Sequence, residues 1–329
     1  MTSKVQSENN VVEVQNLHVS FRTYKGYAHV LNGVNLHVRK LERVGIVGET
    51  GCGKTTTVNA IAHILARQAR IDQGELLFQG EDTLKMTSKE LKRLRASGIS
   101  MIFQDPIASL NPVFTIGSQM QDVIRYSGIE GAKDPKVQKE KSIAALMETS
   151  LPDPERMMKN YPFQLSGGMR QRICIAMALA TPRDLVIADE PTTNLDVTIQ
   201  DQVLQTLKQR VEEKDSALIL ITHSLGVARE IADRIYVMYA GNFVETAATK
   251  ELFKECLHPY ARGLMDCIPK LSGGGIAEGI PGHLPDYMNP PPGCRFEPRC
   301  AHAFAKCREA MPPMIEARPG HFVACYLYC

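Results

Sequence analysis

A short apolar run, a glycine-rich turn and a helical stretch together constrain the fold of this chain most. The apolar run is Val44 to Val47, and the helical stretch covers Lys54 to Arg67. Between them, residues 48–55 read Gly-Glu-Thr-Gly-Cys-Gly-Lys-Thr, a full match to the pattern G-x-x-x-x-G-K-[ST]. The order strand, glycine loop, helix predicts an α/β core that carries a phosphate-binding loop.

Length and composition predict a large folded protein. The chain has 329 residues, 44% apolar and 22% charged, which suits one large domain with an appendage or two domains. Apolar runs are strand-sized, short of the ~20 residues that cross a bilayer, and the polar start MTSKVQSENN does not resemble a secretory signal. We therefore expect a cytoplasmic protein. A net charge of only +2 gives no reason to expect a nucleic-acid partner.

Five further segments organise the chain. Alternating apolar residues from Val11 to Val38 predict antiparallel strands, and the runs Leu185 to Ala188 and Leu218 to Ile221 predict inner strands of a parallel sheet. Strand patterns vanish over residues 106–165, which we interpret as a mostly helical insertion. After Leu257 the chain becomes rich in Pro, Gly and Cys, with Ser-Gly-Gly-Gly at residues 272–275 as a flexible join. We therefore predict two domains, 11–257 and 258–329.

The glycine loop has the residue types that hold a nucleotide. Glycines let successive backbone N–H groups converge on phosphate oxygens at a helix N-terminus. Lys54 is expected to reach the β and γ phosphates, and the Thr55 hydroxyl to bind Mg²⁺. The predicted ATP-binding residues of this segment are Gly48, Glu49, Thr50, Gly51, Cys52, Gly53, Lys54, Thr55 and Thr56.

Two carboxylates follow the apolar run that ends at Ala188. Ligands of α/β sheets lie at the carboxyl ends of the strands, where Asp189 and Glu190 stand. Asp189 is expected to hold Mg²⁺ through its water shell. Glu190, one residue further on, is expected to polarise the attacking water as general base.

Upstream of these acids, residues 165–172 read Leu-Ser-Gly-Gly-Met-Arg-Gln-Arg, which resembles the signature of ABC ATPases. The resemblance implies a head-to-tail dimer in which Ser166, Gly167 and Gly168 cover the nucleotide of the partner. It also implies roles for single residues. Gln104 resembles the glutamine that contacts Mg²⁺ and the attacking water.

Asp196 and His223 extend the resemblance. Asp196 is similar to the aspartate that crosses the dimer interface, and His223 to the histidine that contacts the γ-phosphate. At two positions the residue differs from the one most frequent in the family: Asn194 stands where alanine is frequent, and Ser224 where aspartate is frequent. Neither removes a catalytic group.

An aromatic residue that stacks on adenine is expected upstream of the loop. We choose Tyr27 over Tyr24, although either ring can equally pack on a strand surface.

The C-terminal part narrows the resemblance. Residues 258–264, 280–282 and 293–300 resemble, in this order, the C-terminal extension of oligopeptide and dipeptide permease ATP-binding subunits. The resemblance spans residues 11 to about 325. It implies two transmembrane permease subunits, a paralogous ATPase, an extracellular solute-binding protein, and a position at the cytoplasmic face of the membrane. Members of this family also handle nickel, oligosaccharides or glutathione, so peptide is the leading choice.

Two other functions stay open at this point. One is a soluble ABC ATPase that acts on DNA or ribosomes, although the long coiled-coil arms, tandem cassettes and zinc-finger insertions usual in such proteins are missing from this sequence. The other is a regulatory cassette that does not hydrolyse ATP. Retention of Lys54, Asp189, Glu190 and His223 argues against it.

Five cysteines fall in the last 36 residues, and in a reducing compartment such a cluster suggests metal or iron–sulfur ligation before disulfides. The predicted ligands are Cys294, Cys300, Cys307 and Cys325, with Cys329 as a competing fourth. Four thiolates suit Zn²⁺ or an iron–sulfur cluster, but the tight Cys-x2-Cys pairs typical of structural zinc do not occur here. The permease resemblance implies a 4Fe–4S cluster, with zinc and free or disulfide-linked cysteines as alternatives.

Overall fold

The computed structural model describes residues 9–193, 195–267 and 279–329, and for Val197 the backbone alone. Asn194 and the predicted join at residues 272–275 lie outside this described part. The chain divides into two compact units. The first, here called the loop unit, comprises residues 1–38, 43–84 and 220–329, and the second, the helical unit, comprises residues 39–42 and 85–219. Each unit is described by itself.

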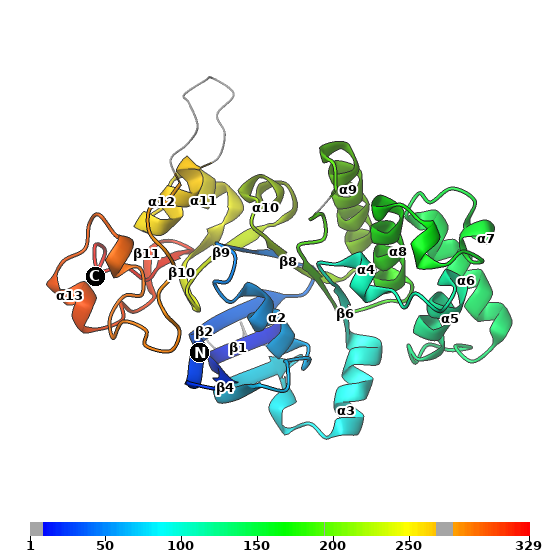
Figure 1. Cartoon of the computed structure of the whole chain (residues 1–329), viewed down its shortest axis with the longest axis horizontal. Helices are drawn as coiled ribbons and strands as arrows, with labels where there is room; N and C mark the ends of the chain where they lie inside the picture. The colour runs from blue at the N-terminus through cyan, green and yellow to red at the C-terminus, as the bar shows by residue number, and fades with distance from the viewer. Residues whose placement is uncertain (1–8, 194, 268–278) are drawn as a thin grey trace. The chain divides into compact units, whose positions relative to one another are not determined.

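An antiparallel sheet forms one part of the loop unit (Figure 1). Strand β1 pairs with β4 in a register that sets Val12 opposite Phe78 and Val19 opposite Ile71. Alternating side chains of β1 and β2 are buried, as expected for a sheet with one face on a core. The predicted antiparallel strands of this segment are therefore confirmed. The strand order is β2 (Gly26–Arg39), β1 (Asn10–Thr23), β4 (Ala69–Phe78) and β5 (Glu81–Asp82).

A second set of strands carries the glycine loop. Strand β3 (Arg43–Val47) lies parallel to β9 (Arg234–Tyr239), with Val44 opposite Arg234 and Val47 opposite Val237. Antiparallel strands continue from β9 in the order β10 (Asn242–Ala248), β12 (His321–Val323) and β11 (Ile315–Arg318). Strand β8 (Ala217–Thr222) is buried along its whole length and apolar except for Thr222, and the boundary between the two units falls within it. Near-continuous apolar runs of this kind are typical of inner strands.

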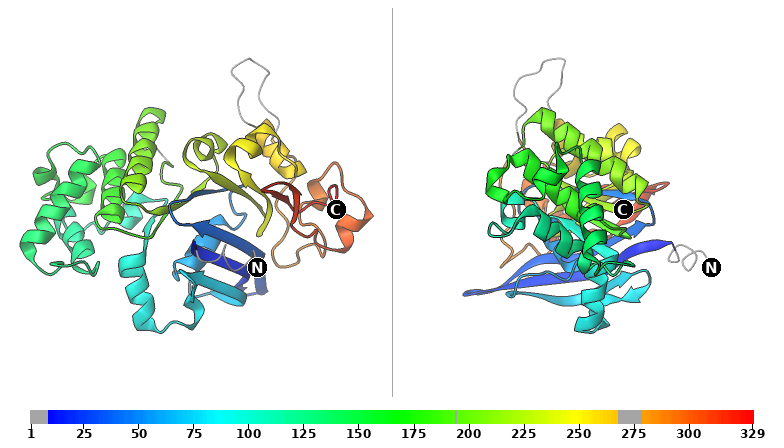
Figure 2. Two further views of the ribbon diagram at one scale, coloured as in Figure 1. Left: turned by 180° about the vertical axis from the view of Figure 1, so that it is seen from behind. Right: turned by 90° about the vertical axis from the view of Figure 1, so that its right-hand side faces the viewer.

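Helices dominate the helical unit, coloured mainly green in Figure 2. Ile116, Met120 and Ile124 lie four residues apart on α5 and are fully buried, so this helix turns one stripe toward its core. The expected helical insertion is present as α4 (Pro106–Ser109), α5 (Ile116–Arg125), α6 (Pro135–Glu148) and α7 (Pro154–Met157). The unit also contains α3 (Ser88–Arg93), α8 (Gly167–Leu179) and α9 (Val197–Glu213).

Two parallel strands organise the other side of the helical unit. Strand β6 (Ile99–Ile102) pairs with β7 (Leu185–Asp189), with Ile99 opposite Leu185 and Ile102 opposite Ala188. All five residues of β7 are buried. This register places the carboxyl ends of the two strands side by side, which brings the residues that follow them to one edge.

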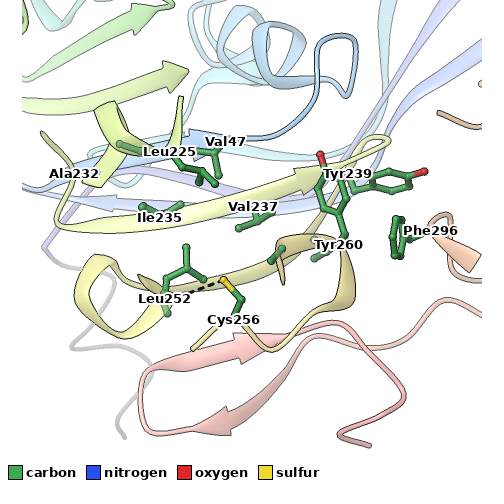
Figure 3. Packing of buried hydrophobic residues seen from close by; sticks show 14 of the residues in the cluster. Val47, Leu225, Ala232, Ile235, Val237, Tyr239, Leu252, Cys256, Tyr260 and Phe296 are labelled. Atoms are coloured by element: carbon green, nitrogen blue, oxygen red, sulfur yellow. Dashed lines mark hydrogen bonds between the residues drawn. The ribbon is translucent and has the colours of Figure 1, made fainter. Parts of the chain in front are cut away.

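The C-terminal residues pack into the core of the loop unit (Figure 3). Phe296 lies with its ring centroid 5.0 Å from that of Tyr239 on β9 and 5.5 Å from that of Tyr260 on α12 (Pro259–Asp266). The rings of Tyr239 and Tyr260 lie 4.6 Å apart in an edge-to-face arrangement. Such aromatic pairs add about 0.5–1.5 kcal/mol each beyond the burial of their area. We call the described residues from 258 onward the tail.

A buried carboxylate fixes the end of the tail. Glu245 on β10 has no exposed surface and accepts backbone hydrogen bonds from Leu257 (2.8 Å) and His258 (2.7 Å). Nε2 of His321 on β12 lies 2.7 Å from the same carboxylate. Because strand β12 pairs with β10 at Glu245 opposite Val323, the chain returns to the sheet near its end. Removing either partner of such a buried pair leaves an uncompensated polar group, which typically costs several kcal/mol.

The remaining helices are short. They are α2 (Lys54–Ile61), α10 (Leu225–Ile231), α11 (Thr249–Lys254) and α13 (Ala305–Glu309), with one 3₁₀ turn at Glu297–Arg299 in the tail. None of the helices in the described part of the chain combines the length and the apolar character that a bilayer span requires.

Candidate functional site

The glycine loop connects β3 to α2, as the sequence predicts. Gly48 has φ +155°, and a Cβ there would lie 2.2 Å from the carbonyl oxygen of Met238. Gly53, at φ +111°, is the N-cap of α2 in the left-handed region, and a Cβ there would meet Leu31 at 2.9 Å. Other residues would be strained at both positions. We call residues 48–55 the phosphate loop.

The lysine of the phosphate loop is folded back on it. Lys54 is 5% exposed, and its ammonium donates to the carbonyl oxygens of Gly48 (2.8 Å) and Glu49 (2.9 Å). These two bonds compensate the burial of a charged group. Gly51 and Thr55 are exposed, so the outer side of the loop faces solvent.

Cys52 is part of the packing beneath the loop. Burial raises the pKa of its thiol to about 11, so the thiol is protonated at neutral pH. The backbone amide of Gly241 donates to its carbonyl at 2.7 Å, which ties the loop to the turn between β9 and β10.

Side chains from the tail also contact the phosphate loop. The Glu49 backbone N–H donates to the hydroxyl of Tyr260 (2.9 Å), and the Tyr287 hydroxyl donates to the carbonyl of Gly51 (2.7 Å). Arg299 forms an ion pair with the Glu49 carboxylate at 3.0 Å. Sequence reasoning missed these three residues because it placed the tail in a separate domain. The available signal was the pair of arginines between Cys294 and Cys300, cations in a segment with few other charges.

In the helical unit, the structure brings two predicted catalytic residues together. The side-chain amide of Gln104 donates to Oε2 of Glu190 at 3.0 Å, and the Thr193 hydroxyl donates to the same oxygen at 3.0 Å. Gln104 follows β6 and Glu190 follows β7, so the parallel register of these strands accounts for their meeting. Thr193 is a partner of Glu190 that sequence reasoning did not identify.

The backbone of Glu190 is unusual. Its φ is +46°, in the left-handed region that costs a residue with a side chain roughly 1–3 kcal/mol and is enriched at functional sites. The preceding Asp189, at the end of β7, is 3% exposed. The turn therefore leaves Asp189 buried at the strand end, while the Glu190 carboxylate meets Gln104 and Thr193.

The signature segment forms the start of a helix. Ser166 is the N-cap of α8, accepts a hydrogen bond from the Met169 N–H at 3.3 Å, and is exposed together with Gly167. A Cβ on Gly168 would lie 2.9 Å from the Ile199 side chain, so a larger residue would force that side chain to shift. Asp196 caps α9 in the same manner, accepting from the Ile199 N–H at 3.0 Å.

The other predicted residues lie in the loop unit. His223 is exposed and directly follows β8, and Ser224 is the N-cap of α10, a position that serine and aspartate suit equally well. The Tyr27 ring is 40% exposed and carries the Arg70 guanidinium 4.5 Å from its centroid, whereas Tyr24 is 93% exposed. The choice between these two rings for adenine remains a prediction.

Four predicted cysteines of the tail line one small cavity. Cys294, Cys300, Cys307 and Cys325 surround about 20 Å³, roughly the room of one water molecule, and the exposed Cys329 is not part of this lining. Burial raises the pKa of the Cys294 thiol to about 11. In the described part of the chain, no three or more His, Cys, Asp or Glu side chains are arranged to hold a metal ion. The predicted iron–sulfur cluster therefore finds no metal site in the structure, although its expected ligands do converge.

Three family models match the sequence, one of which, described as AAA domain, putative AbiEii toxin, Type IV TA system, matches residues 160–229. The model described as ABC transporter matches residues 31–193. The model described as the C-terminal region of oligopeptide/dipeptide transporters matches residues 244–307. The expected cassette fold also agrees with solved structures. A dimeric bacterial ABC transporter cassette, MJ0796, has a TM-score of 0.65 and 27% identity and covers 72% of this chain and 98% of its own.

Several curated relatives align over almost the whole chain. The dipeptide transport ATP-binding protein DppD of Bacillus subtilis is 42% identical over 320 residues, which cover 96% of this chain and 94% of the relative. The oligopeptide transport ATP-binding protein OppD of Salmonella typhimurium is 42% identical over 327 residues, or 99% and 96% of the two chains. With the phosphate loop and the paired acids in place, this chain belongs to the ABC transporter family, as an ABC ATPase of the oligopeptide/dipeptide transporter group.

Proposed function

We propose that this chain hydrolyses ATP at the cytoplasmic face of a membrane to power the import of dipeptides or oligopeptides. The observation that carries the proposal is the near full-length similarity to transport ATP-binding proteins named for dipeptides and oligopeptides, tail included. As in the family, the chain would work with two transmembrane permease subunits, a paralogous ATPase and, indirectly, an extracellular solute-binding protein.

In the proposed mechanism, the phosphate loop binds the triphosphate. Backbone amides of residues 48–56 surround the phosphates, and Lys54 exchanges its contacts with the Gly48 and Glu49 carbonyls for the β and γ phosphates. Because the lysine is already held at the loop, it needs little reorganisation to reach the nucleotide. Thr55 and Asp189 are each assigned to Mg²⁺ by their places in the motifs, and this ion would neutralise charge that develops on the phosphates.

Hydrolysis is proposed to use Glu190 as general base with Gln104 beside it. Glu190 accepts a proton from the attacking water, and Gln104 and Thr193 orient the carboxylate through its Oε2. His223 is assigned to the γ-phosphate. Ser166 to Gly168, together with Asp196, are assigned to the nucleotide of the paralogous partner, and the exposure of Ser166 and Gly167 is compatible with that role.

The iron–sulfur cluster is proposed separately. Cys294, Cys300, Cys307 and Cys325 supply the four thiols that a 4Fe–4S cluster requires, and all four line one cavity. A cluster binds each sulfur to a different iron atom, so its ligands need not converge on a single point as they do for one metal ion. These cysteines would hold the cluster and stabilise the tail, which has little apolar core of its own.

The test of the transport function is reconstitution. The chain is combined with its paralogous ATPase, the permease pair and the solute-binding protein in proteoliposomes, and uptake of labelled dipeptides and oligopeptides is measured with and without ATP. We expect ATP-dependent uptake that disappears when this chain and its paralogue both carry the phosphate-loop Lys→Ala change, Lys54→Ala here. Uptake of nickel, an oligosaccharide or glutathione in place of peptides would contradict the peptide assignment.

The same preparation separates the remaining alternatives. A chain that binds ATP but never turns it over in the assembled transporter would be the regulatory cassette. A chain that fails to co-purify with any permease, yet hydrolyses ATP when ribosomes or DNA are added, would be the soluble ATPase.

A further inference from the structure

Three side chains of the tail hold the phosphate loop from one side. Tyr260 accepts the Glu49 N–H, Tyr287 donates to the Gly51 carbonyl, and Arg299 pairs with the Glu49 carboxylate. Two of them fix the backbone on either side of Thr50. The third, Arg299, pairs with the negative charge of Glu49, and the inference is argued from this ion pair.

Arg299 is held rigidly at the Glu49 carboxylate. Its side chain is only 5% exposed, and Nη1 lies 3.0 Å from Oε2 of Glu49. Nε donates to the Pro281 carbonyl (2.8 Å) and Nη2 to the Ile280 carbonyl (2.9 Å). Nη1 also donates to the Tyr239 hydroxyl at 3.4 Å, so all three nitrogens of the guanidinium are used and four different groups hold its plane.

Glu49 needs such a partner because of its position. It is the second residue of a loop that gathers N–H groups for an anion, and its side chain is 29% exposed. A free carboxylate at this place would repel the triphosphate, since like charges within a few ångströms destabilise each other strongly where water is partly excluded. Pairing with Arg299 removes most of that repulsion and holds the carboxylate toward the tail.

We propose that Arg299 is a positioning residue for ATP, which neutralises Glu49 and thereby lets the phosphate loop bind a highly charged nucleotide. The inference rests on the proposed binding of ATP at this loop and adds a role for the tail. Through Arg299, the tail sets the affinity of the ATPase for its nucleotide.

A purely structural role is the competing explanation. Arg299 also bonds to Ile280 and Pro281, so its loss could simply loosen the tail. The two explanations differ in what happens when Glu49 is neutralised as well. Only the electrostatic role predicts that the second change restores binding.

The experiment measures Kd for ATP, ADP and AMP by titration calorimetry on the full chain, with no hydrolysis required. Arg299→Gln is expected to raise Kd for ATP about tenfold, with a smaller rise for ADP and the smallest for AMP, since repulsion scales with phosphate charge. The double variant Glu49→Gln/Arg299→Gln is expected to return to within about threefold of wild type. A double variant as weak as Arg299→Gln, or an equal loss for all three nucleotides, would overturn the proposal.

Two further variants complete the design. Arg318→Gln is the matched control, because it removes an arginine from an ion pair with Glu255 in the same tail, and it should bind ATP as wild type does. Arg299→Lys keeps the charge and should bind ATP within about threefold of wild type. If Arg299→Gln does not fold, Arg299→Lys decides the matter, and a tenfold loss there would refute a role based on charge.

The proposed function and this inference fail in different ways. If the wild-type chain and Lys54→Ala bind ATP equally poorly, ATP binding at the loop is wrong. If the wild-type chain binds, Lys54→Ala does not, and the double variant is not rescued, only the role of Arg299 is wrong.

Discussion

Glu190 combines an unfavourable backbone with a well-ordered side chain. Its φ of +46° is held in place while two donors, Gln104 and Thr193, share one carboxylate oxygen. A residue kept in such a conformation at the end of an inner strand suits a base that must stand at a fixed point. The strained backbone of Glu190 lowers the stability of the fold and holds its carboxylate in a fixed position.

Glu190→Gln should therefore keep ATP binding and lose hydrolysis. The amide preserves size and can still accept the two hydrogen bonds through its oxygen, but it cannot take a proton. We expect steady-state turnover in the assembled transporter to fall by roughly 100-fold or more, with Kd for ATP changed by less than about threefold.

Glu75→Gln serves as the matched control for that variant, since Glu75 is an exposed acid on β4. It should leave turnover unchanged. Near-normal turnover in Glu190→Gln would show that another group accepts the proton.

At the residue scale, the sequence predicts what local motifs encode. The phosphate loop and the two acids can be predicted because each directly follows a recognisable strand, and Gln104 because it resembles a glutamine of the ABC family. The Arg299–Glu49 pair could not be found in that manner, because 250 residues separate its members and no local pattern links them. Thr193 could not be found either, because its contact with Glu190 depends on a turn conformation that the sequence does not reveal.

At the scale of elements, the tail differs most from expectation. Its Pro, Gly and Cys content suggested a separate element, yet Phe296 packs against β9 and α12, and β12 extends the sheet. The predicted domain division at residue 258 remains a prediction, and the described tail belongs to the same compact unit as the phosphate loop. The amino-acid composition indicates that the tail has few apolar residues for a core of its own. It does not indicate which other core the tail packs against.

The cysteines of the tail give a prediction at this scale. Protein purified without oxygen should contain about four iron and four acid-labile sulfide per chain, with visible absorption. Cys300→Ser should bleach the colour and lower the melting temperature, because the cluster would help to fold the tail. Cys267→Ser is the control, since this cysteine lies outside the cavity lining and should leave the colour unchanged. A colourless protein with stoichiometric zinc and no iron would refute the cluster.

At the scale of the whole molecule, the family resemblance implies that the proposed ATP site is completed by a second chain. Ser166 and Gly167 are exposed at the start of α8, and the family resemblance assigns them to a partner. We expect the isolated chain to hydrolyse ATP slowly. Adding the paralogous ATPase and the permease should raise turnover per chain by at least about tenfold, because each active site then receives its second half.

Protein concentration provides the decisive measurement for that prediction. Specific activity of the isolated chain should rise with its concentration, as expected when two molecules must meet. Activity that stays constant over a hundredfold dilution, and does not respond to the paralogue, would contradict a shared site.

The contact between Arg299 and Glu49 also orders events during synthesis. The ribosome makes Glu49 early and Arg299 250 residues later, an interval on the order of 10–50 s at the usual rates of translation. Until then the nascent loop carries an uncompensated negative charge and binds ATP weakly. A chain released before residue 299 keeps this defect permanently. On the proposed role of Arg299, completion of the polypeptide therefore precedes tight binding of ATP.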